Sequence, residues 1–306
     1  MAKICSYFCR QLLIMEKSFK NYIILILLAV VWGSSFILMK RGLVAYDYMQ
    51  VAALRLFFAF LSLTPFMLRA IKVVQRKHLF AIVAMALFGN GIPAFLFTKA
   101  QTELDSSVIG ILNSLVPLFT LLLGVYFFKT KPTKTNIAGI IIGLCGAVVL
   151  IYSTMGEGIK INNYAFLVIS ATVMYAISIN VIKKYLHDLD ALSITALAFL
   201  LIGPLSAFYI FNTDFLEIAN TTNQGVISLG DIALLAVVCT SAAVVIFNKL
   251  INQSTAIFAS SVTYLIPVVA IFWGVLDAEK VALIHLLSVV IILSGVYLVN
   301  KKSPTK

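Results

Sequence analysis

Ten long runs of apolar residues, separated by short polar pieces, dominate the pattern of the chain. Each run is close to the roughly 20 residues that a helix needs to cross a bilayer, and none alternates as a barrel strand does. The pattern therefore predicts an all-α membrane protein with ten transmembrane helices. The runs cover residues 22–39, 48–68, 79–98, 106–128, 135–152, 163–182, 191–211, 229–248, 255–276 and 281–299.

The second half of the chain repeats the first. One block, at an offset of 150, pairs Phe97, Lys99, Pro117 and Gly124 with Phe247, Lys249, Pro267 and Gly274. Another, at an offset of 143, pairs Trp32, Ser35, Lys40 and Arg41 with Tyr175, Ser178, Lys183 and Lys184. The repeat unit thus holds five spans. Because five is odd, the second copy enters the membrane from the opposite face, which is the inverted repeat that secondary transporters use for alternating access.

These boundaries divide the chain into four parts. Residues 1–21 are predicted to be a cytoplasmic tail, 22–152 the first repeat, 163–299 the second repeat and 300–306 a second cytoplasmic tail. The run that starts at Tyr22 is long enough to span and has no small-residue cleavage site after it, so we interpret it as a retained helix and not a signal peptide. Met15 is a second candidate start of the chain.

Composition and charge agree with this class. Hydrophobic residues make up 61% of the chain and charged residues 11%, whereas a soluble domain is about half apolar and a quarter charged. Most of the 23 Lys and Arg residues fall in pieces that are cytoplasmic if both termini are cytoplasmic. The formal net charge of +11 is then a consequence of topology, and no nucleic-acid partner is expected.

Several kinds of chemistry are missing from the sequence. All 12 acidic residues map to loops or span ends, which argues against a carboxylate proton relay and favours facilitated exchange, or coupling through an edge group such as His285. No glycine-rich phosphate loop is present, and the four cysteines lack metal or redox spacing. We therefore predict no cofactor, no metal and no catalytic residues, with an intramembrane enzyme as the weaker reading.

Polar residues inside the predicted spans are the candidates for a transport pathway, because they are costly in lipid and usually face the bundle interior. Asn113 and Pro117 share one face of the fourth run, and Tyr264 and Pro267 lie in the corresponding part of the ninth. Two matched helices interrupted by proline indicate a binding site near the midplane, where Pro117 and Pro267 would let the helices bend. The alternative is that both prolines only kink helices for packing.

Other candidates come from the remaining repeat-related spans. Asn90 is an amide in mid-span that needs hydrogen-bond partners, and Trp32 and Tyr175 suit an aromatic lining, with the small polar Ser35 and Ser178 one turn further on. Each of these is equally compatible with helix packing.

Arg55 places a charge inside the second run, which has to be compensated. We expect it to pair at an outer gate with an acidic residue. The candidates are Asp47, Glu103 and Asp105.

Short motifs resemble one family. Val31-Trp32-Gly33-Ser34-Ser35-Phe36, Ala53-Leu54-Arg55-Leu56 and Pro117 are similar to the pattern of the drug/metabolite transporter superfamily, specifically its EamA-like branch. Ala278-Glu279-Lys280 followed by Gly295 resembles the signature that closes each repeat of that family. Thr130 stands where the first repeat would have its Glu, and Ser288 where the second would have a Gly like Gly139, so a symmetric role for Glu279 is not expected.

The resemblance implies a ten-helix permease that exports amino acids, nucleotide-related metabolites or toxic compounds from a central cavity. We therefore expect an inner-membrane permease whose spans one, three, four, six, eight and nine line the cavity. Its partners would be a small-molecule substrate and the lipid bilayer, and a homodimer is left as an alternative to a monomer. A non-transporting membrane scaffold or lipid-interacting protein is the main competing interpretation, and an aqueous channel is a further one.

Overall fold

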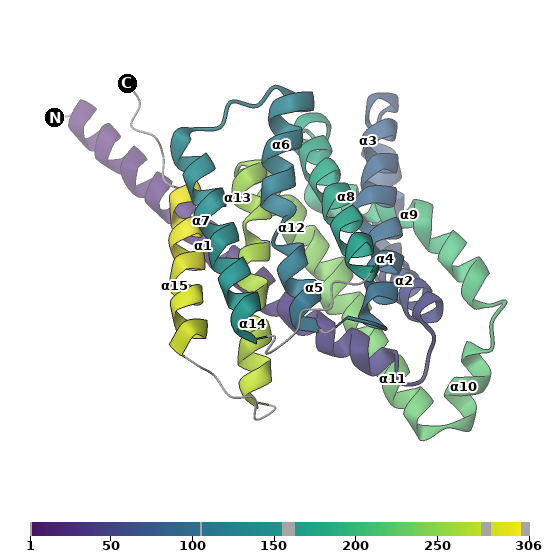
Figure 1. Ribbon diagram of the computed structural model, residues 1–306. Helices are drawn as coiled ribbons and strands as arrows, with labels where there is room; N and C mark the ends of the chain where they lie inside the picture. The colour runs from purple at the N-terminus through teal and green to yellow at the C-terminus, as the bar shows by residue number, and fades with distance from the viewer. Residues whose placement is uncertain (1, 105, 155–162, 277–282, 301–306) are drawn as a thin grey trace.

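The computed structural model describes residues 2–104, 106–154, 163–276 and 283–300, and within these ranges the regular structure is entirely helical (Figure 1). Six helical segments are long and apolar enough to cross a membrane, and four shorter apolar helices lie within the other predicted runs. The six segments are Phe19–Gly42, Tyr48–Val73, Arg76–Gln101, Tyr164–Tyr185, Ala191–Ile210 and Asn223–Gln253. The shorter four are Val116–Phe128, Lys134–Gly146, Ala256–Val269 and Val290–Val299, of which the second and the fourth are parts of longer helices that run from Lys134 to Thr154 and from Leu283 to Asn300.

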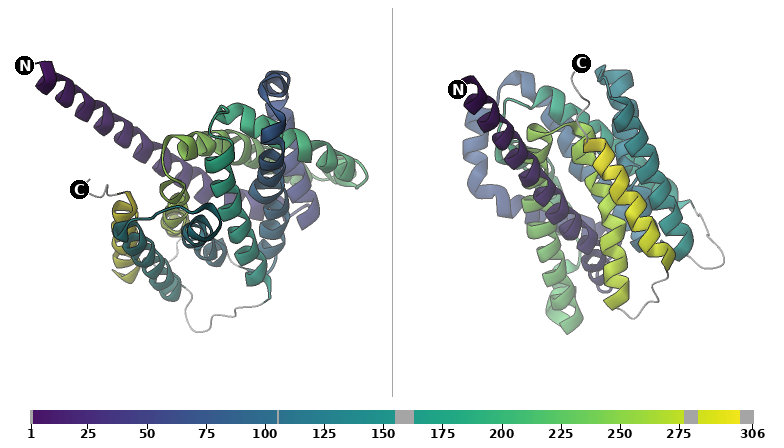
Figure 2. Two further views of the ribbon diagram at one scale, coloured as in Figure 1. Left: turned by 90° about the horizontal axis from the view of Figure 1, so that it is seen from above. Right: turned by 90° about the vertical axis from the view of Figure 1, so that its left-hand side faces the viewer.

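The first helix is longer than predicted. α1 runs from Ala2 to Gly42, so the segment 1–21 that we expected to be a separate tail continues the first span as helix from its second residue. Figure 2 shows α1 crossing the bundle obliquely, and Figure 1 shows that α1 begins at the same end of the bundle where α15 (Leu283–Asn300) finishes. We call this the termini end.

The third and eighth predicted runs are composite helices with a wide turn in the middle. The third consists of η1 (Arg76–His78), α3 (Leu79–Ala84), the π-helical η2 (Met85–Gly91) and α4 (Ile92–Gln101). The eighth consists of α11 (Asn223–Leu234), the π-helical η3 (Leu235–Ala242) and α12 (Ala243–Gln253). The two π segments start at Met85 and Leu235, which are related by the repeat offset of 150.

A side chain bonds back across each wide turn. Asn90 Nδ2 donates to the carbonyl of Met85 at 3.3 Å, and Thr240 Oγ1 donates to the carbonyl of Leu235 at 3.0 Å. Both partners lie five residues earlier in the chain and are themselves repeat-related. Because π-bulges in helices frequently mark functional sites, the two turns draw attention to the middle of the bundle.

The fourth and ninth runs are broken helices. α5 (Ser106–Asn113) is followed by α6 (Val116–Phe128), and α13 (Ala256–Ser260) by α14 (Val262–Leu276). Pro117 lies in the first turn of α6, where its missing N–H costs no helical hydrogen bond. Pro267 lies inside α14, which continues through it. Pro117 thus starts a helix, and the break in the ninth run precedes Pro267 instead of falling at it.

Two helix pairs flank this central set. α2 (Tyr48–Val73) packs along α9 (Ala191–Ile210), and α7 (Lys134–Thr154) packs along α15. The α7–α15 contact depends on glycine: a Cβ on Gly295 would lie 2.5 Å from the backbone nitrogen of Gly143, so the two backbones touch where side chains would otherwise stand. α8 (Tyr164–Tyr185) and a short helix that the pattern did not predict, α10 (Phe215–Thr221), complete the fold.

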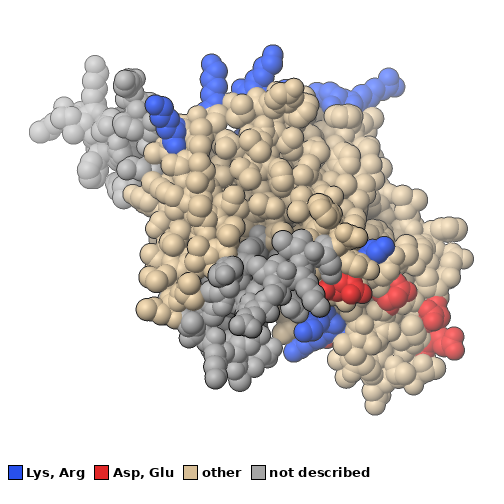
Figure 3. Space-filling view, in the orientation of Figure 1, with Lys and Arg blue, Asp and Glu red and all other residues tan. Residues whose placement is uncertain are grey.

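Charged side chains are distributed unevenly on the face seen in Figure 3. Lys and Arg lie along the termini end, whereas Asp and Glu gather at the opposite end near α10 and α11, where further Lys and Arg side chains lie beside them. The region around Glu279, with its predicted family signature, lies outside the described residues, as does Asp105.

Candidate functional site

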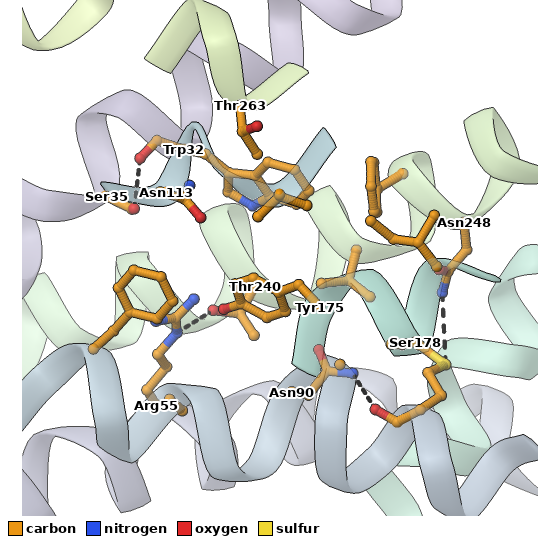
Figure 4. Close-up of a pocket in the computed structure, with 18 of the residues that line it drawn as sticks. Trp32, Ser35, Arg55, Asn90, Asn113, Tyr175, Ser178, Thr240, Asn248 and Thr263 are labelled. Carbon is orange, nitrogen blue, oxygen red and sulfur yellow. Dashed lines mark hydrogen bonds between the residues drawn. The ribbon is translucent and has the colours of Figure 1, made fainter. Parts of the chain in front are cut away.

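A cavity lies in the middle of the bundle, between the two π turns and the two broken helices. It contains about 110 Å³ of space open to the centres of water molecules, which is room for several waters or a small ligand. Its walls come from the six expected runs and also from α2. The polar and aromatic lining residues labelled in Figure 4 are Trp32, Ser35, Arg55, Asn90, Asn113, Tyr175, Ser178, Thr240, Asn248 and Thr263.

Two aromatic pairs form opposing parts of this wall. Trp32 meets Phe247 edge to face with ring centroids 4.9 Å apart, and Tyr175 stacks on Phe97 at 5.6 Å. Trp32 and Tyr175 are repeat-related, and so are Phe97 and Phe247. Each pair therefore joins the first helix of one repeat to the third helix of the other. The Trp32 indole is further held by its Nε1, which donates to the carbonyl of Cys239 at 2.9 Å.

Arg55 enters the cavity from α2. Its Nε donates to Thr240 Oγ1 at 2.7 Å, and the hydroxyl of Thr240 in turn bonds the carbonyl of Leu235 inside the π turn. The expected partner Asp47 instead caps α2, where its carboxylate accepts from the backbone N–H of Met49 and of Gln50. Within the described residues no carboxylate lies within ion-pair distance of Arg55, which corrects the outer-gate pairing with Asp47 or Glu103.

Asn113 closes the cavity at the break between α5 and α6. Its side chain is only 6% exposed, and its Oδ1 has no hydrogen-bond partner among the described residues. Such a buried acceptor is normally satisfied, so its orientation into a cavity leaves a place for a donor from a water or a ligand.

A second amide lies deeper in the wall. Asn248 of α12 is 1% exposed and donates through Nδ2 to Thr195 Oγ1 at 2.9 Å, so it is anchored to α9 and closes that side of the cavity.

Seven of the predicted residues line this one cavity. They are Trp32, Ser35, Arg55, Asn90, Asn113, Tyr175 and Ser178. Tyr264 does not: it is fully buried and its hydroxyl donates to the carbonyl of Ile140 at 3.1 Å, while its neighbour Thr263 lines the cavity instead. Pro117 and Pro267 are not lining residues either.

Thr240, Phe97, Phe247 and Asn248 are lining residues that sequence reasoning did not assign to the site. The repeat offered a signal for three of them, because Phe97 and Phe247 are matched at the offset of 150 and Thr240 lies 150 positions after Asn90.

The repeats differ at two matched lysines. Lys183, in the last turn of α8, donates through Nζ to the carbonyls of Ile251, Asn252 and Ser254 at 3.0, 3.2 and 2.6 Å, and so caps the end of α12. Its repeat partner Lys40, in the last turn of α1, is exposed and forms no hydrogen bond or ion pair within the described chain. It borders a surface hollow together with Gln101 and Thr102, at the end of α4.

Comparisons with known proteins agree with this architecture. The model of the EamA-like transporter family matches residues 20–152 and again residues 162–301. An uncharacterised transporter of Archaeoglobus fulgidus is 25% identical over 92% of this chain and 99% of its own length. A protein of Salmonella typhimurium described as a "Probable amino-acid metabolite efflux pump" is 24% identical, over 91% of this chain and 94% of its own.

The uncharacterised inner membrane transporter YedA of Escherichia coli K12 is 25% identical over 89% of this chain and 88% of its own. A solved crystal structure with 15% sequence identity superposes with a TM-score of 0.70 over 92% of this chain and 96% of that chain. At this identity, the structural likeness concerns the fold alone.

Proposed function

Because this chain belongs to the EamA-like transporter family, we propose that it exports small metabolites, such as amino acids or related compounds, across the inner membrane by alternating access. The chain is a multi-pass membrane transporter and not an enzyme. The curated relatives that it resembles are also transporters. The central cavity is the substrate site in this proposal. Trp32, Ser35, Asn90, Asn113, Tyr175 and Ser178 are its substrate-contacting residues.

The observation that carries the proposal is the pair of aromatic contacts in the cavity wall. Trp32–Phe247 and Tyr175–Phe97 are equivalent under the repeat, and each joins one repeat to the other. A cavity built in this way at the interface of two repeats is the arrangement found at the substrate sites of secondary transporters. A scaffold gives no reason for polar and aromatic residues to recur at equivalent places around an internal space.

The matched lysines support a mechanism for alternation. Two repeats of one fold that differ in conformation can exchange those conformations, which converts one access state into the other. In the state described here Lys183 caps α12, while Lys40 has no hydrogen bond or ion pair to any described residue. In the alternative state Lys40 would cap α4 at Gln101 and Thr102, and Lys183 would release α12.

The proposed topology of the protein has ten spans in two inverted five-helix repeats, with the termini end in the cytoplasm. The lysines and arginines at that end support this orientation, because basic loops are retained on the cytoplasmic side (Figure 3). In this topology the six long helical segments form six of the spans, and each of the four shorter apolar segments belongs to one of the other four.

Binding is tested first on purified protein, by a thermal-stability screen against amino acids, nucleosides, vitamins and cationic drugs. A ligand that binds only the folded state raises the melting temperature by mass action. We expect a hit that disappears in Asn113→Ala, and efflux of the same compound from preloaded proteoliposomes. If no compound class raises the melting temperature and none is exported, the proposal is overturned in favour of a scaffold.

Coupling is tested in the same proteoliposomes with an imposed pH gradient. No Asp or Glu is buried among the described residues, so the proposal includes exchange without a carboxylate proton relay. We expect the efflux rate to be nearly independent of the gradient. Strong proton-driven accumulation of substrate would contradict that part of the mechanism.

A further inference from the structure

We propose that two residues of the central cavity recognise the two polar groups of the substrate: Arg55 is an anion subsite that takes a carboxylate, and Asn113 Oδ1 takes an N–H donor of the same molecule. The inference rests on the proposed function and assigns a chemical class to the compound that the cavity takes. It combines a positive charge and an unsatisfied acceptor that line the same internal space.

The Arg55 guanidinium has unused hydrogen-bonding capacity. Among the described residues its one side-chain partner is Thr240 Oγ1, at 2.7 Å, and this bond uses the Nε–H. Four further N–H donors belong to the two terminal nitrogens, and an arginine stays charged throughout the physiological range. Those nitrogens present the fork geometry that binds a carboxylate through two parallel hydrogen bonds.

The position of the charge also favours a ligand as its partner. Arg55 is half-buried, lies on a helix long and apolar enough to span the membrane, and has no carboxylate within ion-pair distance in the described parts of the chain. A charge in such a place is costly unless something compensates it. The hydroxyl of Thr240 is neutral and orients the guanidinium through Nε, which leaves the terminal nitrogens directed at the cavity side of α2 (Figure 4).

Asn113 provides an acceptor on the wall formed by the broken helix. It is 6% exposed and lines the cavity, and its Oδ1 has no hydrogen-bond partner in the described parts of the chain. A carboxylate with no other polar group would satisfy Arg55 and leave this oxygen unpaired. A ligand N–H, and an ammonium above all, would satisfy it with a charge-assisted hydrogen bond.

The aromatic part of the cavity wall indicates the chemistry of the rest of the ligand. The pairs Trp32–Phe247 and Tyr175–Phe97 present aromatic surface to the same cavity. Such walls suit an apolar or aromatic side chain, since aromatic pairs gain from offset or edge contacts with another ring. The expected ligand therefore has a charged polar end and an apolar body.

The test uses the full-length protein and two matched ligand series, and measures affinity by calorimetry and by thermal shift. The first series is L-phenylalanine, its amide, which lacks the carboxylate, and 3-phenylpropionate, which lacks the ammonium. The second is the same series built on L-leucine. We expect the free amino acids to bind at least about tenfold more tightly than the amides, which is the discrimination expected from a hydrogen bond to a charged group.

Two variants assign the contacts to residues. Arg55→Gln should bring the affinity of the acid down to that of the amide, and Arg55→Lys should restore part of it because the charge remains. Asn113→Ala should lower the affinity for the amino acid and leave the affinity for 3-phenylpropionate unchanged, since that compound has no donor for Oδ1. The comparison of acid with amide on the unaltered protein needs no variant, so it decides the inference even if Arg55→Gln fails to fold.

The outcomes separate this inference from the proposed function. If amides or amines bind and are exported as well as the acids, Arg55 is not an anion subsite, although the chain is still an exporter. If inorganic phosphate competes with the acids at equal concentration, the site takes a different anion and the carboxylate assignment is wrong. If no compound of any class binds or is exported, it is the proposed function itself that fails.

Discussion

Ser114 Oγ lies 3.3 Å from the carbonyl oxygen of Thr263, and this contact joins the two broken helices of the cavity wall. The carbonyl oxygen of Gly110, one turn back, lies at the same distance, so the hydroxyl proton is shared between the two acceptors. Thr263 lies four residues before Pro267, so its carbonyl is the one that the proline leaves without a helical donor. The Ser114 hydroxyl therefore supplies in one repeat the hydrogen bond that Pro267 removes from the other.

This relationship predicts that Ser114→Ala lowers the stability of the protein, because a buried carbonyl loses its donor. The expected cost is about 1–3 kcal/mol, measured as a fall in the thermal unfolding midpoint. Pro267→Ala restores a backbone N–H to that carbonyl, so in the Pro267→Ala background the same serine substitution should cost much less.

Thr120→Val is the matched control for the serine variant. Thr120 is buried in the same helical region, but its Oγ1 has no partner among the described residues, so the change should be neutral or stabilising. Equal losses from Ser114→Ala and Thr120→Val would show that the Ser114–Thr263 bond has no special role.

The glycine contact between α7 and α15 predicts a large effect from a single methyl group. In Gly295→Ala the new Cβ would lie 2.5 Å from the nitrogen and 2.6 Å from the Cα of Gly143, and backbone atoms cannot move aside as a flexible side chain can. Overpacking of this kind costs about 1–3 kcal/mol. Thermal unfolding and the yield of folded protein should both decrease.

Gly230→Ala is the corresponding control, because a Cβ at Gly230 of α11 meets nothing within 4 Å. It should leave stability unchanged or raise it by up to about 1 kcal/mol, the helix preference of alanine over glycine. A Gly295→Ala protein as stable as Gly230→Ala would mean that α7 and α15 are not held at backbone contact.

Lys40 and Lys183 should shift the access equilibrium in opposite directions. Lys183→Ala removes the cap on α12 and disfavours the state described here, whereas Lys40→Ala disfavours the alternative state. The readout is the labelling rate of a cysteine placed at Ser178 in the cavity, with a membrane-impermeant thiol reagent applied from one side. The background replaces the four native cysteines by serine.

The double variant provides the control for that experiment. Lys40→Ala with Lys183→Ala removes both caps, so its labelling rate should return toward that of the parent protein. If the two single variants change labelling in the same direction, the lysines do not report on exchange between two states.

At the termini end a carboxylate links two loops. Asp188 accepts from Lys77 Nζ at 2.6 Å and lies 3.1 Å from His78 Nε2. The hydrogen bond from Lys77, with a smaller contribution from His78, holds the pKa of Asp188 well below its ordinary value of 3.8. A depressed carboxyl pKa stabilises the folded state above the unfolded pKa, and that stability is lost as the pH falls below it.

The unfolding midpoint should therefore decrease as the pH falls below about 5, and Asp188→Asn should make this decrease smaller. The effect is expected to be small because Lys77 and Asp188 are solvent-exposed and their interaction is screened. Glu217→Gln, at an exposed acid on α10, serves as the comparison. Identical pH profiles for Asp188→Asn and the parent protein would refute the assignment.

The apolar pattern predicted the helical membrane class because hydrophobic length is a local property of the sequence. The spans of α2, α8 and α9 begin within one residue of their predicted starts. The position of each helix break was not predictable in the same way. The prolines show that an interruption is near, but the chain turns at Ser114 and at Ser261, where contacts across the fold decide the geometry.

The π turns were also beyond the local pattern, since a single extra residue in a turn barely alters an apolar run. Tyr264 shows a related limit. Adjacent helical residues point about 100° apart, and the sequence pattern did not decide whether Thr263, Tyr264 or both would face the cavity. The hydroxyl of Tyr264 instead reaches the carbonyl of Ile140 on α7.

The broken ninth helix also constrains how the protein is made. α13 has five residues and α14 has 15, whereas about 20 are needed to cross the hydrocarbon core. Neither piece is a complete insertion signal by itself. During synthesis the membrane-insertion machinery must therefore recognise the two pieces together, as one span that is continuous in hydrophobicity although its helix is broken.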